Sequence, residues 1–237
     1  MGQVTTQAIT ANEKGFSVNL PLDIDATTHR HAKAVKISQR MHIRPNDILQ
    51  SINVFNGDTS GFDLKIHMPY WCENPSLRID GNDQKLKAVN GFVHVNCPAN
   101  SVLAISVKLP MSLQIVPPGR SLLTKDTPPG PGVAPEKGLQ YGPFALMFNR
   151  QMYPDVTEHD IAVTVPLKDN GHPFVDQNLP DDWTTGGAVP ILIKAQLKGG
   201  KKVLLTPCAN LTMTTLTVDD PYILRFSEVA LSEPETK

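Results

Sequence analysis

The stretch Phe62-Asp-Leu-Lys-Ile-His-Met-Pro-Tyr-Trp-Cys72 decides the fold class of this chain. From Phe62 to Met68, apolar and polar side chains alternate, which is the pattern of a β-strand with one buried face and one solvated face. Pro69 lacks the N–H that a neighbouring strand would accept, so we expect the strand to end there and to leave Tyr70 and Trp71 at the rim of a sheet. The stretch is a structural signature, and we assign no catalytic role to it.

Composition agrees with a chain made of strands and turns. The 237 residues suffice for one large all-β domain or two smaller ones. The 21 prolines and 16 glycines favour many short strands and turns over long amphipathic helices. A formal net charge of -1 provides no basic footprint for a nucleic-acid backbone, so we expect no nucleic-acid partner.

The sequence also bears on where the protein is located and on whether its cysteines form disulfides. No stretch approaches the roughly 20 apolar residues that span a bilayer, and the first residues do not resemble a secretory leader. We therefore expect no membrane partner and, if Met1 is the native start, a cytoplasmic protein. The three cysteines, Cys72, Cys97 and Cys208, are odd in number and far apart, so we predict buried free thiols and no disulfide framework.

Strand patterns and turn signals recur at short intervals along the chain. Asn56-Gly57-Asp58 and Asn90-Gly91 are strong turn signals between alternating segments, and Lys198-Gly-Gly-Lys201 indicates a hairpin. Parallel strands would need helical crossovers, which are missing here. We therefore predict an all-β fold, namely a jelly-roll-like antiparallel β-sandwich, with two consecutive β-sandwich domains.

A region rich in proline and glycine divides the chain. It can neither hold a strand ladder nor bury a core, so it is a boundary or a long surface loop. The predicted segments are a tail or edge strand at 1–14, a first β-sandwich domain at 15–120, a Pro/Gly-rich linker or loop at 121–137, and a second β-rich domain at 138–237.

Six motifs in a fixed order carry a family resemblance: Phe16-Ser-Val-Asn-Leu20, Leu64-Lys-Ile-His-Met-Pro-Tyr-Trp-Cys72, Arg78-Ile-Asp-Gly81, Gly91-Phe-Val93, Val107-Lys-Leu-Pro-Met111 and Leu139-Gln-Tyr-Gly-Pro143. The chain from about Gly15 to Phe226 resembles the C-terminal β-sandwich half of glycoside hydrolase family 127, the β-L-arabinofuranosidase-like family. The resemblance after Phe148 is the vaguest part.

The resemblance implies chemistry that these 237 residues do not carry. In that family an (α/α)6 barrel precedes the sandwiches and holds a glutamate acid/base and a cysteine nucleophile in a zinc–thiolate cluster, with two cysteines adjacent in sequence. This chain has no adjacent cysteine pair and no sequence pattern of a helical barrel. We therefore transfer no catalytic or zinc role to Cys72, Cys97 or Cys208, and we expect no metal and no cofactor.

Three further clusters have a functional and a structural interpretation. His29-Arg30-His31 places two imidazoles on one extended segment, but without a third ligand in sequence a solvated loop is favoured over a metal site. The carboxylate pairs Asp181-Asp182 and Asp219-Asp220 are of a type used for acid/base catalysis or calcium binding, but they stand beside prolines in turn-like contexts. Adjacency alone does not position carboxylates across a cleft, so a structural role is favoured for both.

Four aromatic residues could stack on a sugar ring: Tyr70, Trp71, Tyr141 and Trp183. Trp71 follows a buried strand directly, so a core or interface position is favoured for it. We therefore treat Trp71 and Tyr70 as structural markers. Trp183 and Tyr141 are the candidates for carbohydrate binding.

The chain is thus expected to be a non-catalytic accessory module of an arabinofuranosidase-like hydrolase, although the family it resembles is a glycosidase. Its expected partner is the catalytic (α/α)6 barrel, as a domain or a subunit, with a homodimer and a carbohydrate as further candidates. The alternative is a stand-alone carbohydrate-binding protein, and an enzyme in its own right is least favoured. A scaffold should expose an apolar patch where its partner docks, whereas a carbohydrate-binding module should show a groove rimmed by aromatic and polar groups.

Overall fold

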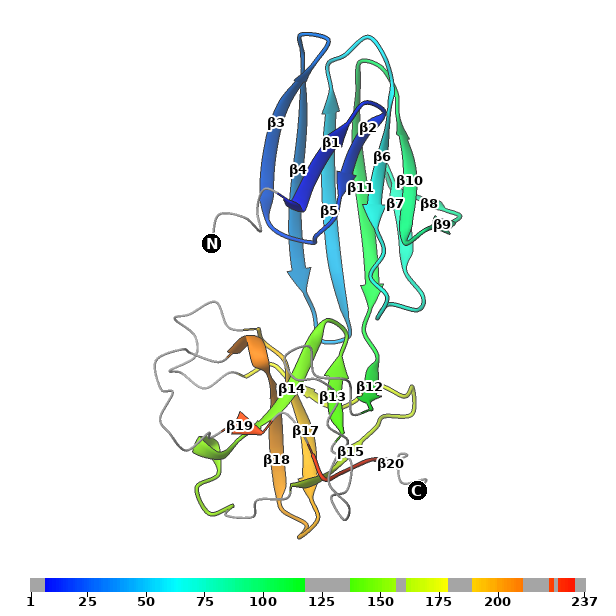
Figure 1. Ribbon diagram of the computed structural model, residues 1–237. Helices are drawn as coiled ribbons and strands as arrows, with labels where there is room; N and C mark the ends of the chain where they lie inside the picture. Colours follow the sequence, from blue (N-terminus) through cyan, green and yellow to red (C-terminus); the bar gives the residue numbers. More distant parts are fainter. Residues whose placement is uncertain are drawn as a thin grey trace. The chain divides into compact units, whose positions relative to one another are not determined.

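The computed structural model describes residues 7–117, 137–156, 161–178, 189–210, 222–223 and 226–232. These residues form β-strands joined by turns and short helical turns (Figure 1), as predicted. The chain divides into two compact units, Met1–Met111 and Ser112–Lys237.

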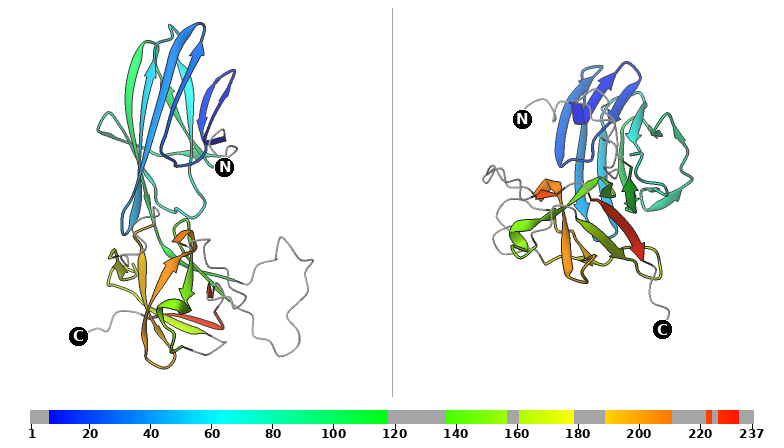
Figure 2. Two further views of the ribbon diagram at one scale, coloured as in Figure 1. Left: turned by 90° about the vertical axis from the view of Figure 1, so that its left-hand side faces the viewer. Right: turned by 60° about the horizontal axis from the view of Figure 1, so that its bottom comes forward.

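The first unit contains two β-sheets that lie face to face (Figures 1 and 2). The five-stranded sheet consists, in spatial order, of β1 (Ile9–Asn12), β2 (Gly15–Val18), β6 (Phe62–His67), β10 (Phe92–Cys97) and β9 (Ala88–Val89). The six-stranded sheet consists of β3 (Ile24–Arg30), β4 (Lys33–Ile43), β5 (Asp47–Asn56), β11 (Ser101–Pro110), β7 (Ser76–Ile79) and β8 (Asn82–Gln84). The expected β-sandwich is confirmed.

The core of the first unit lies between these sheets. Along β6, buried residues alternate with partly exposed ones, so that Phe62, Leu64 and Ile66 all point inward. The Phe62 ring meets the Phe16 ring edge-on, with centroids 5.0 Å apart, a favourable arrangement for two aromatic quadrupoles. The six-stranded sheet contributes the buried side chains of Val35, Ile37, Ile48, Ile52, Val54, Ile105, Val107 and Leu109.

The predicted end of the strand at Pro69 is also confirmed. β6 ends at His67, and the Met68 N–H still donates to the Gly91 carbonyl at 2.7 Å. Beyond Pro69 the chain turns, Trp71 is only 6% exposed, and Tyr70 is 86% exposed. Trp71 is therefore a core residue, as the sequence favoured, and its neighbour Tyr70 is a surface residue.

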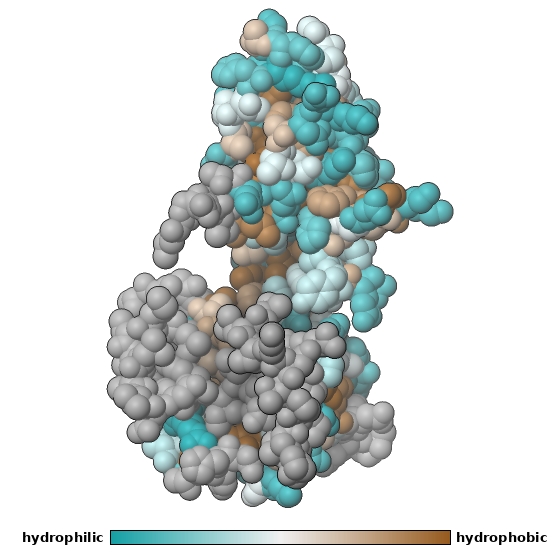
Figure 3. All heavy atoms as spheres, in the orientation of Figure 1, coloured by the Kyte–Doolittle hydropathy of each residue, from teal (hydrophilic) through white to brown (hydrophobic). Residues whose placement is uncertain are grey.

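Figure 3 shows hydrophobic residues gathered toward the lower part of this unit and hydrophilic residues over its upper part.

The second unit is built around one sheet. Its main path consists of β12 (Leu113–Val116), β13 (Gly138–Tyr141), β14 (Phe144–Asn149), β18 (Lys202–Pro207), β17 (Leu192–Leu197), β15 (Ala162–Pro166) and β20 (Glu228–Ser232). Two short strands lie off this path, with β16 (Val175–Asp176) pairing with β17 and β19 (Tyr222–Ile223) pairing with β14. In the described part of this unit, 3₁₀ turns are formed by η1 (Arg150–Met152) and η3 (Cys208–Asn210).

The hairpin expected at Lys198-Gly-Gly-Lys201 connects β17 to β18, which are antiparallel neighbours. The Leu197 N–H donates to the Lys201 carbonyl at 2.8 Å, and Gly200 has a φ of 86°, a left-handed conformation that glycine adopts without a steric penalty. Fully buried side chains of this unit include Leu139, Leu146, Met147, Phe148, Ile191, Leu192, Ile193, Leu205 and Phe226.

Two neighbouring strand pairs are parallel, contrary to the purely antiparallel expectation: β2 with β6, and β15 with β20. Between β2 and β6 the chain builds β3, β4 and β5 in the opposite sheet before it returns. The connection between these two parallel strands therefore runs through the opposite sheet and not through a helix, which is why parallel pairing is possible here without a helical crossover.

The division between the units falls at Met111, earlier than the predicted boundary at 120. The reason is β12, which pairs with β13 and so joins the second unit. Ile9–Asn12, within the predicted tail or edge strand, forms the edge strand β1. Of the predicted linker, residues 121–136 lie outside the described part of the chain, and Lys137 pairs with Phe226. Within the described residues, no helix is long and apolar enough to cross a membrane.

Candidate functional site

The three cysteines are free thiols. Cys72 and Cys97 are buried, as predicted, whereas Cys208 is partly exposed. Burial raises the pKa of Cys72 to about 11 and that of Cys97 to about 12, and it also raises the pKa of Cys208. A thiol nucleophile needs the opposite change, because only the thiolate attacks. The environment of each cysteine therefore favours the unreactive protonated form.

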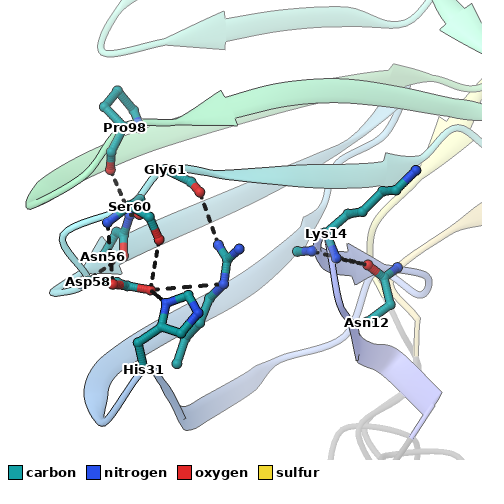
Figure 4. A network of polar contacts seen from close by, with 10 residues as sticks. Asn12, Lys14, His31, Asn56, Asp58, Ser60, Gly61 and Pro98 are labelled. Atoms are coloured by element: carbon teal, nitrogen blue, oxygen red, sulfur yellow. Dashed lines mark hydrogen bonds and ion pairs between the residues drawn. The ribbon is translucent and has the colours of Figure 1, made fainter.

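The segment His29-Arg30-His31 forms a hairpin end rather than an open loop. β3 ends at Arg30 and β4 begins at Lys33. His31 and Ala32 make the two-residue turn between them with φ values of 48° and 61°. Positive φ at both positions is the geometry of a type I′ turn, whose twist matches that of the flanking strands. The turn directs the His31 side chain toward the loop that follows β5 (Figure 4).

Asp58 lies close to two side chains of this hairpin end, those of His31 and Arg30. Its side chain is completely buried, and its Oδ2 lies 2.9 Å from His31 Nδ1 and 3.9 Å from Arg30 Nε. The carboxylate also accepts hydrogen bonds from the backbone N–H of Ser60 at 3.3 Å and from its hydroxyl at 3.1 Å. Burial alone would raise the pKa of Asp58, but the hydrogen bonds from His31 and Ser60 outweigh burial and hold this pKa below its usual value.

Asn56 extends the network to the turn between β10 and β11. Its amide donates to the Ser60 carbonyl at 3.1 Å and to the Pro98 carbonyl at 2.7 Å, and its side-chain oxygen accepts from the Asp58 N–H. The Asn100 N–H donates to the Asp58 carbonyl at 2.9 Å. Figure 4 shows Asn56, Asp58, Ser60 and Pro98 pointing toward one another. The cluster ties three chain turns at one end of the sandwich, which is a structural role. In the part of the chain that the structure describes, no three His, Cys, Asp or Glu residues gather as metal ligands would.

A groove of about 410 Å³ lies on the outer face of the sheet in the second unit. Along β17, Lys194 and Gln196 are exposed and alternate with buried residues, and Lys202 lies beside them on β18, opposite Gln196. Tyr153 and Phe174 also line the groove. Aromatic surface with a few polar groups is the usual composition of a small-ligand site.

Tyr153 is fixed at the groove by three contacts. Its hydroxyl oxygen accepts a hydrogen bond from the Leu204 N–H at 2.8 Å. Its ring stacks on Phe148 with centroids 5.5 Å apart, and the Lys201 ammonium lies 5.5 Å from its centroid. Burial raises the pKa of Tyr153. The hydroxyl is therefore protonated at neutral pH and, with its oxygen already accepting a bond, retains a proton to donate.

Phe174 offers the exposed aromatic surface of the groove. It is 41% exposed, and its carbonyl accepts a hydrogen bond from the Lys194 N–H at 2.9 Å. The Lys168 ammonium lies 5.4 Å from its ring centroid, within the range of a cation–π contact.

Of the two residues predicted to bind carbohydrate, Trp183 and Tyr141, the structure describes only Tyr141. Tyr141 is completely buried in β13, so its ring has no free surface on which a sugar could stack. Trp183 and the carboxylate pairs Asp181-Asp182 and Asp219-Asp220 lie outside the described residues. No sequence pattern singles out Phe174 or Tyr153, because only strand pairing brings them together with β17 and β18.

An exposed apolar pair lies on the outer face of the six-stranded sheet in the first unit. Phe55 of β5 and Val102 of β11 are direct partners across the two strands, and they are 42% and 69% exposed. Ala104, two residues further along β11, is also exposed on this face. Large apolar side chains placed together on an open sheet face are typical of a protein contact surface.

Residues 17–111 match the model of the β-L-arabinofuranosidase GH127 middle domain. The first unit is therefore GH127-like. No curated protein matches the sequence. Among solved structures, the chain is similar to a GH127 β-L-arabinofuranosidase from Geobacillus stearothermophilus T6, with a TM-score of 0.61, 14% identity, and coverage of 97% of this chain and 35% of that one.

Two further structures agree in fold. One, described as a glycoside hydrolase, has a TM-score of 0.60 and 14% identity, with 94% of this chain and 37% of the other covered. The second, a GH127 β-arabinofuranosidase, has a TM-score of 0.56 and 15% identity, with 92% and 36% covered. At these identities the likeness concerns the fold. The chain spans about a third of the length of these structures, and the fold likeness extends beyond the GH127-like unit to nearly the whole chain.

Proposed function

We propose that this chain is a non-catalytic accessory β-sandwich module of an arabinofuranosidase-like glycoside hydrolase, and that its GH127-like unit packs against a catalytic (α/α)6 barrel. The observation that carries the proposal is the match of residues 17–111 to a domain described as the middle domain of such enzymes. A middle domain accompanies other domains. The barrel is the one that the family resemblance assigns to the catalytic step.

The cysteines support a non-catalytic role. The resemblance assigns catalysis to a cysteine held as a thiolate by a metal, whereas burial raises the pKa of Cys72, Cys97 and Cys208. We therefore expect no hydrolysis of aryl arabinofuranosides by this chain alone.

The Phe55–Val102 pair supports packing against a partner. Both side chains leave apolar surface in water on the outer face of the six-stranded sheet. Burying such surface contributes roughly 25 cal/mol per Å². We assign the docking of the barrel to this face.

The test is a binding titration between this chain and a separately expressed catalytic barrel from the same source, followed by calorimetry and sedimentation. We expect a one-to-one complex. Phe55→Asp and Val102→Asp should each weaken it by at least about tenfold, equivalent to about 1.4 kcal/mol. Val89→Asp is the matched control, because Val89 is 48% exposed but lies on the other sheet. Absence of a complex contradicts the accessory role, and equal effects of all three variants contradict the assigned face.

Self-association is part of the same proposal, because the exposed Phe55–Val102 pair also offers apolar surface to a second copy of the chain. Sedimentation velocity of the chain without the barrel measures it directly. We expect a homodimer at micromolar concentrations, and a monomer at every concentration removes this element of the proposal.

The second candidate, a stand-alone carbohydrate-binding protein, is favoured by one observation. The groove in the second unit combines an exposed Phe174 with the polar side chains of Lys194, Gln196 and Lys202.

A further inference from the structure

The groove on the outer face of β17 and β18 has a positive rim. Lys194 and Lys202 line it, and Lys168 stands over Phe174. The Lys194 ammonium lies 4.0 Å from an Asp176 carboxylate oxygen, at the outer limit of an ion pair, so this contact neutralises it only in part. Within the described residues, Lys202 has no carboxylate partner. Among the residues that the structure describes, the groove therefore has more ammonium than carboxylate groups, and this lining is complementary to an anion.

We propose that this groove binds an acidic oligosaccharide, with the ring of a uronate sugar stacked on Phe174 and its carboxylate paired with Lys202. This inference does not depend on packing against a catalytic barrel, because every residue that carries it lies in the second unit.

The exposed part of Phe174 provides the stacking surface. The face of an aromatic ring is electronegative, and the axial C–H bonds of a sugar ring present a weakly positive, apolar patch of similar size. The backbone hydrogen bond from Lys194 to the Phe174 carbonyl fixes this residue beside β17, so little order has to be gained when a ligand binds.

The polar groups around Phe174 suit the hydroxyls and the carboxylate of a uronate. The Gln196 amide donates to the Gly200 carbonyl at 2.9 Å, which fixes the side chain and leaves its oxygen as an acceptor for a sugar hydroxyl. The Tyr153 hydroxyl has a proton to donate. Lys202 supplies the opposite charge for the carboxylate.

The topology of the sheet argues against an acidic peptide in the same place. A peptide that binds to a sheet usually adds a strand to a free edge through backbone hydrogen bonds. Here β17 has β18 on one side and β15 and β16 on the other, so its backbone groups along the groove floor are engaged. Recognition must come from side chains, which suits a hydroxyl-rich ligand.

The test is isothermal titration of the full chain with three ligands of equal length: tetragalacturonic acid, its fully methyl-esterified and therefore neutral form, and tetraglutamate. We expect saturable binding of tetragalacturonic acid at low salt, binding of the neutral sugar weaker by at least about tenfold, and no binding of the peptide. Phe174→Ala and Lys202→Glu should each weaken binding of the acidic sugar by about tenfold, equivalent to about 1.4 kcal/mol. Lys87→Glu, an exposed charge reversal in the first unit, should leave it unchanged.

Three results would overturn the proposal. Equal affinity for tetraglutamate would mean that the groove is only a charged patch. Equal affinity for the neutral tetrasaccharide would mean that Lys202 does not bind the carboxylate. No binding of tetragalacturonic acid would mean that the groove is not a site for an acidic oligosaccharide. Saturation-transfer NMR on the unaltered chain is independent of how the variants fold. Irradiation of aromatic protons should enhance the ring protons of the sugar, and the absence of enhancement contradicts stacking on Phe174.

Discussion

The Nδ1 atom of His31, at an exposed hairpin tip, lies 2.9 Å from the Oδ2 atom of Asp58, whose side chain has no exposed surface. A buried carboxylate is tolerated only when hydrogen bonds and opposite charges replace the water it has lost. His31 and Ser60 supply the hydrogen bonds, and Arg30 adds a positive charge at 3.9 Å. One end of the sandwich is therefore held by an ionised group rather than by apolar packing.

Asp58→Asn should lower the melting temperature at neutral pH, because the amide that replaces one carboxylate oxygen cannot accept these hydrogen bonds and the charge facing His31 is lost. Asp63→Asn is the matched control. Asp63 also pairs with a histidine, His94, at 2.8 Å, but its side chain is about a third exposed, and exposed pairs contribute little. Thermal unfolding of both variants followed by circular dichroism checks this, and similar losses in the two would contradict a special role for Asp58.

The lowered pKa of Asp58 predicts how this contribution depends on pH. A carboxyl whose pKa is lower in the folded state stabilises the fold above its unfolded-state pKa, here 3.8, and that stability is lost as the pH falls through the folded-state value. The difference in melting temperature between the unaltered chain and Asp58→Asn should therefore be full near pH 7 and shrink below pH 3.8. A difference that stays constant down to pH 2 would show that the charge of Asp58 is not what stabilises this end of the sandwich.

Trp71 and Tyr70 are adjacent in sequence but should respond in opposite ways to truncation. Trp71 is 6% exposed and Tyr70 is 86% exposed. Trp71→Ala removes a large buried side chain and should cost about 3–5 kcal/mol of unfolding free energy. Tyr70→Ala should change it by less than about 0.5 kcal/mol, as is usual for a surface site. Denaturant titrations followed by circular dichroism measure both, and an unchanged midpoint for Trp71→Ala would mean that Trp71 lies at the surface in solution.

Features that depend on residues adjacent in sequence could be predicted, whereas features that depend on the pairing of distant strands could not. The alternation from Phe62 to Met68 is local, so strand β6 and its end before Pro69 could be predicted. The turn signal at Asn56-Gly57-Asp58 was visible, but nothing in it showed that Asp58 would be buried under a hairpin tip some distance away along the chain.

The same limit explains why the residues that line the groove could not be predicted from the sequence. From sequence, Tyr141 is one of four aromatic residues that could stack on a sugar ring, but β13 has β12 on one side and β14 on the other, and Tyr141 is completely buried. Phe174 and Lys202 come from separate strand ends, and they share one groove only because β16 and β18 both pair with β17. A single sequence contains no signal of that pairing.

Gly15 marks a place where two backbones approach too closely for a side chain. β2 and β6 are parallel neighbours, with Gly15 beside Asp63, and a Cβ at position 15 would lie 1.9 Å from the Asp63 carbonyl oxygen. Gly15→Ala should therefore force the strands apart and destabilise the first unit by about 1–3 kcal/mol or more. Gly199→Ala is the control, because nothing lies within 4 Å of its added Cβ. Equal stability of the two variants would show that β2 and β6 are not paired at this position.

The buried thiols predict slow cysteine chemistry in the folded chain. A pKa of about 12 for Cys97, compared with 9.0 for an ordinary thiol, lowers the thiolate fraction at pH 8 by roughly a thousandfold. Reaction with Ellman's reagent should be slow for Cys97 and Cys72 and faster for the partly exposed Cys208. All three should react fast in guanidinium, and Cys208→Ser identifies the early phase. Because folding raises the pKa values of these thiols, the thiols of the unfolded chain ionise first. Their contribution to the free energy of unfolding should therefore be fully present below pH 9 and be lost as the pH rises from 9 toward 12. Rapid labelling of Cys97 at pH 8 without denaturant would show that the first unit opens readily at its β10 strand.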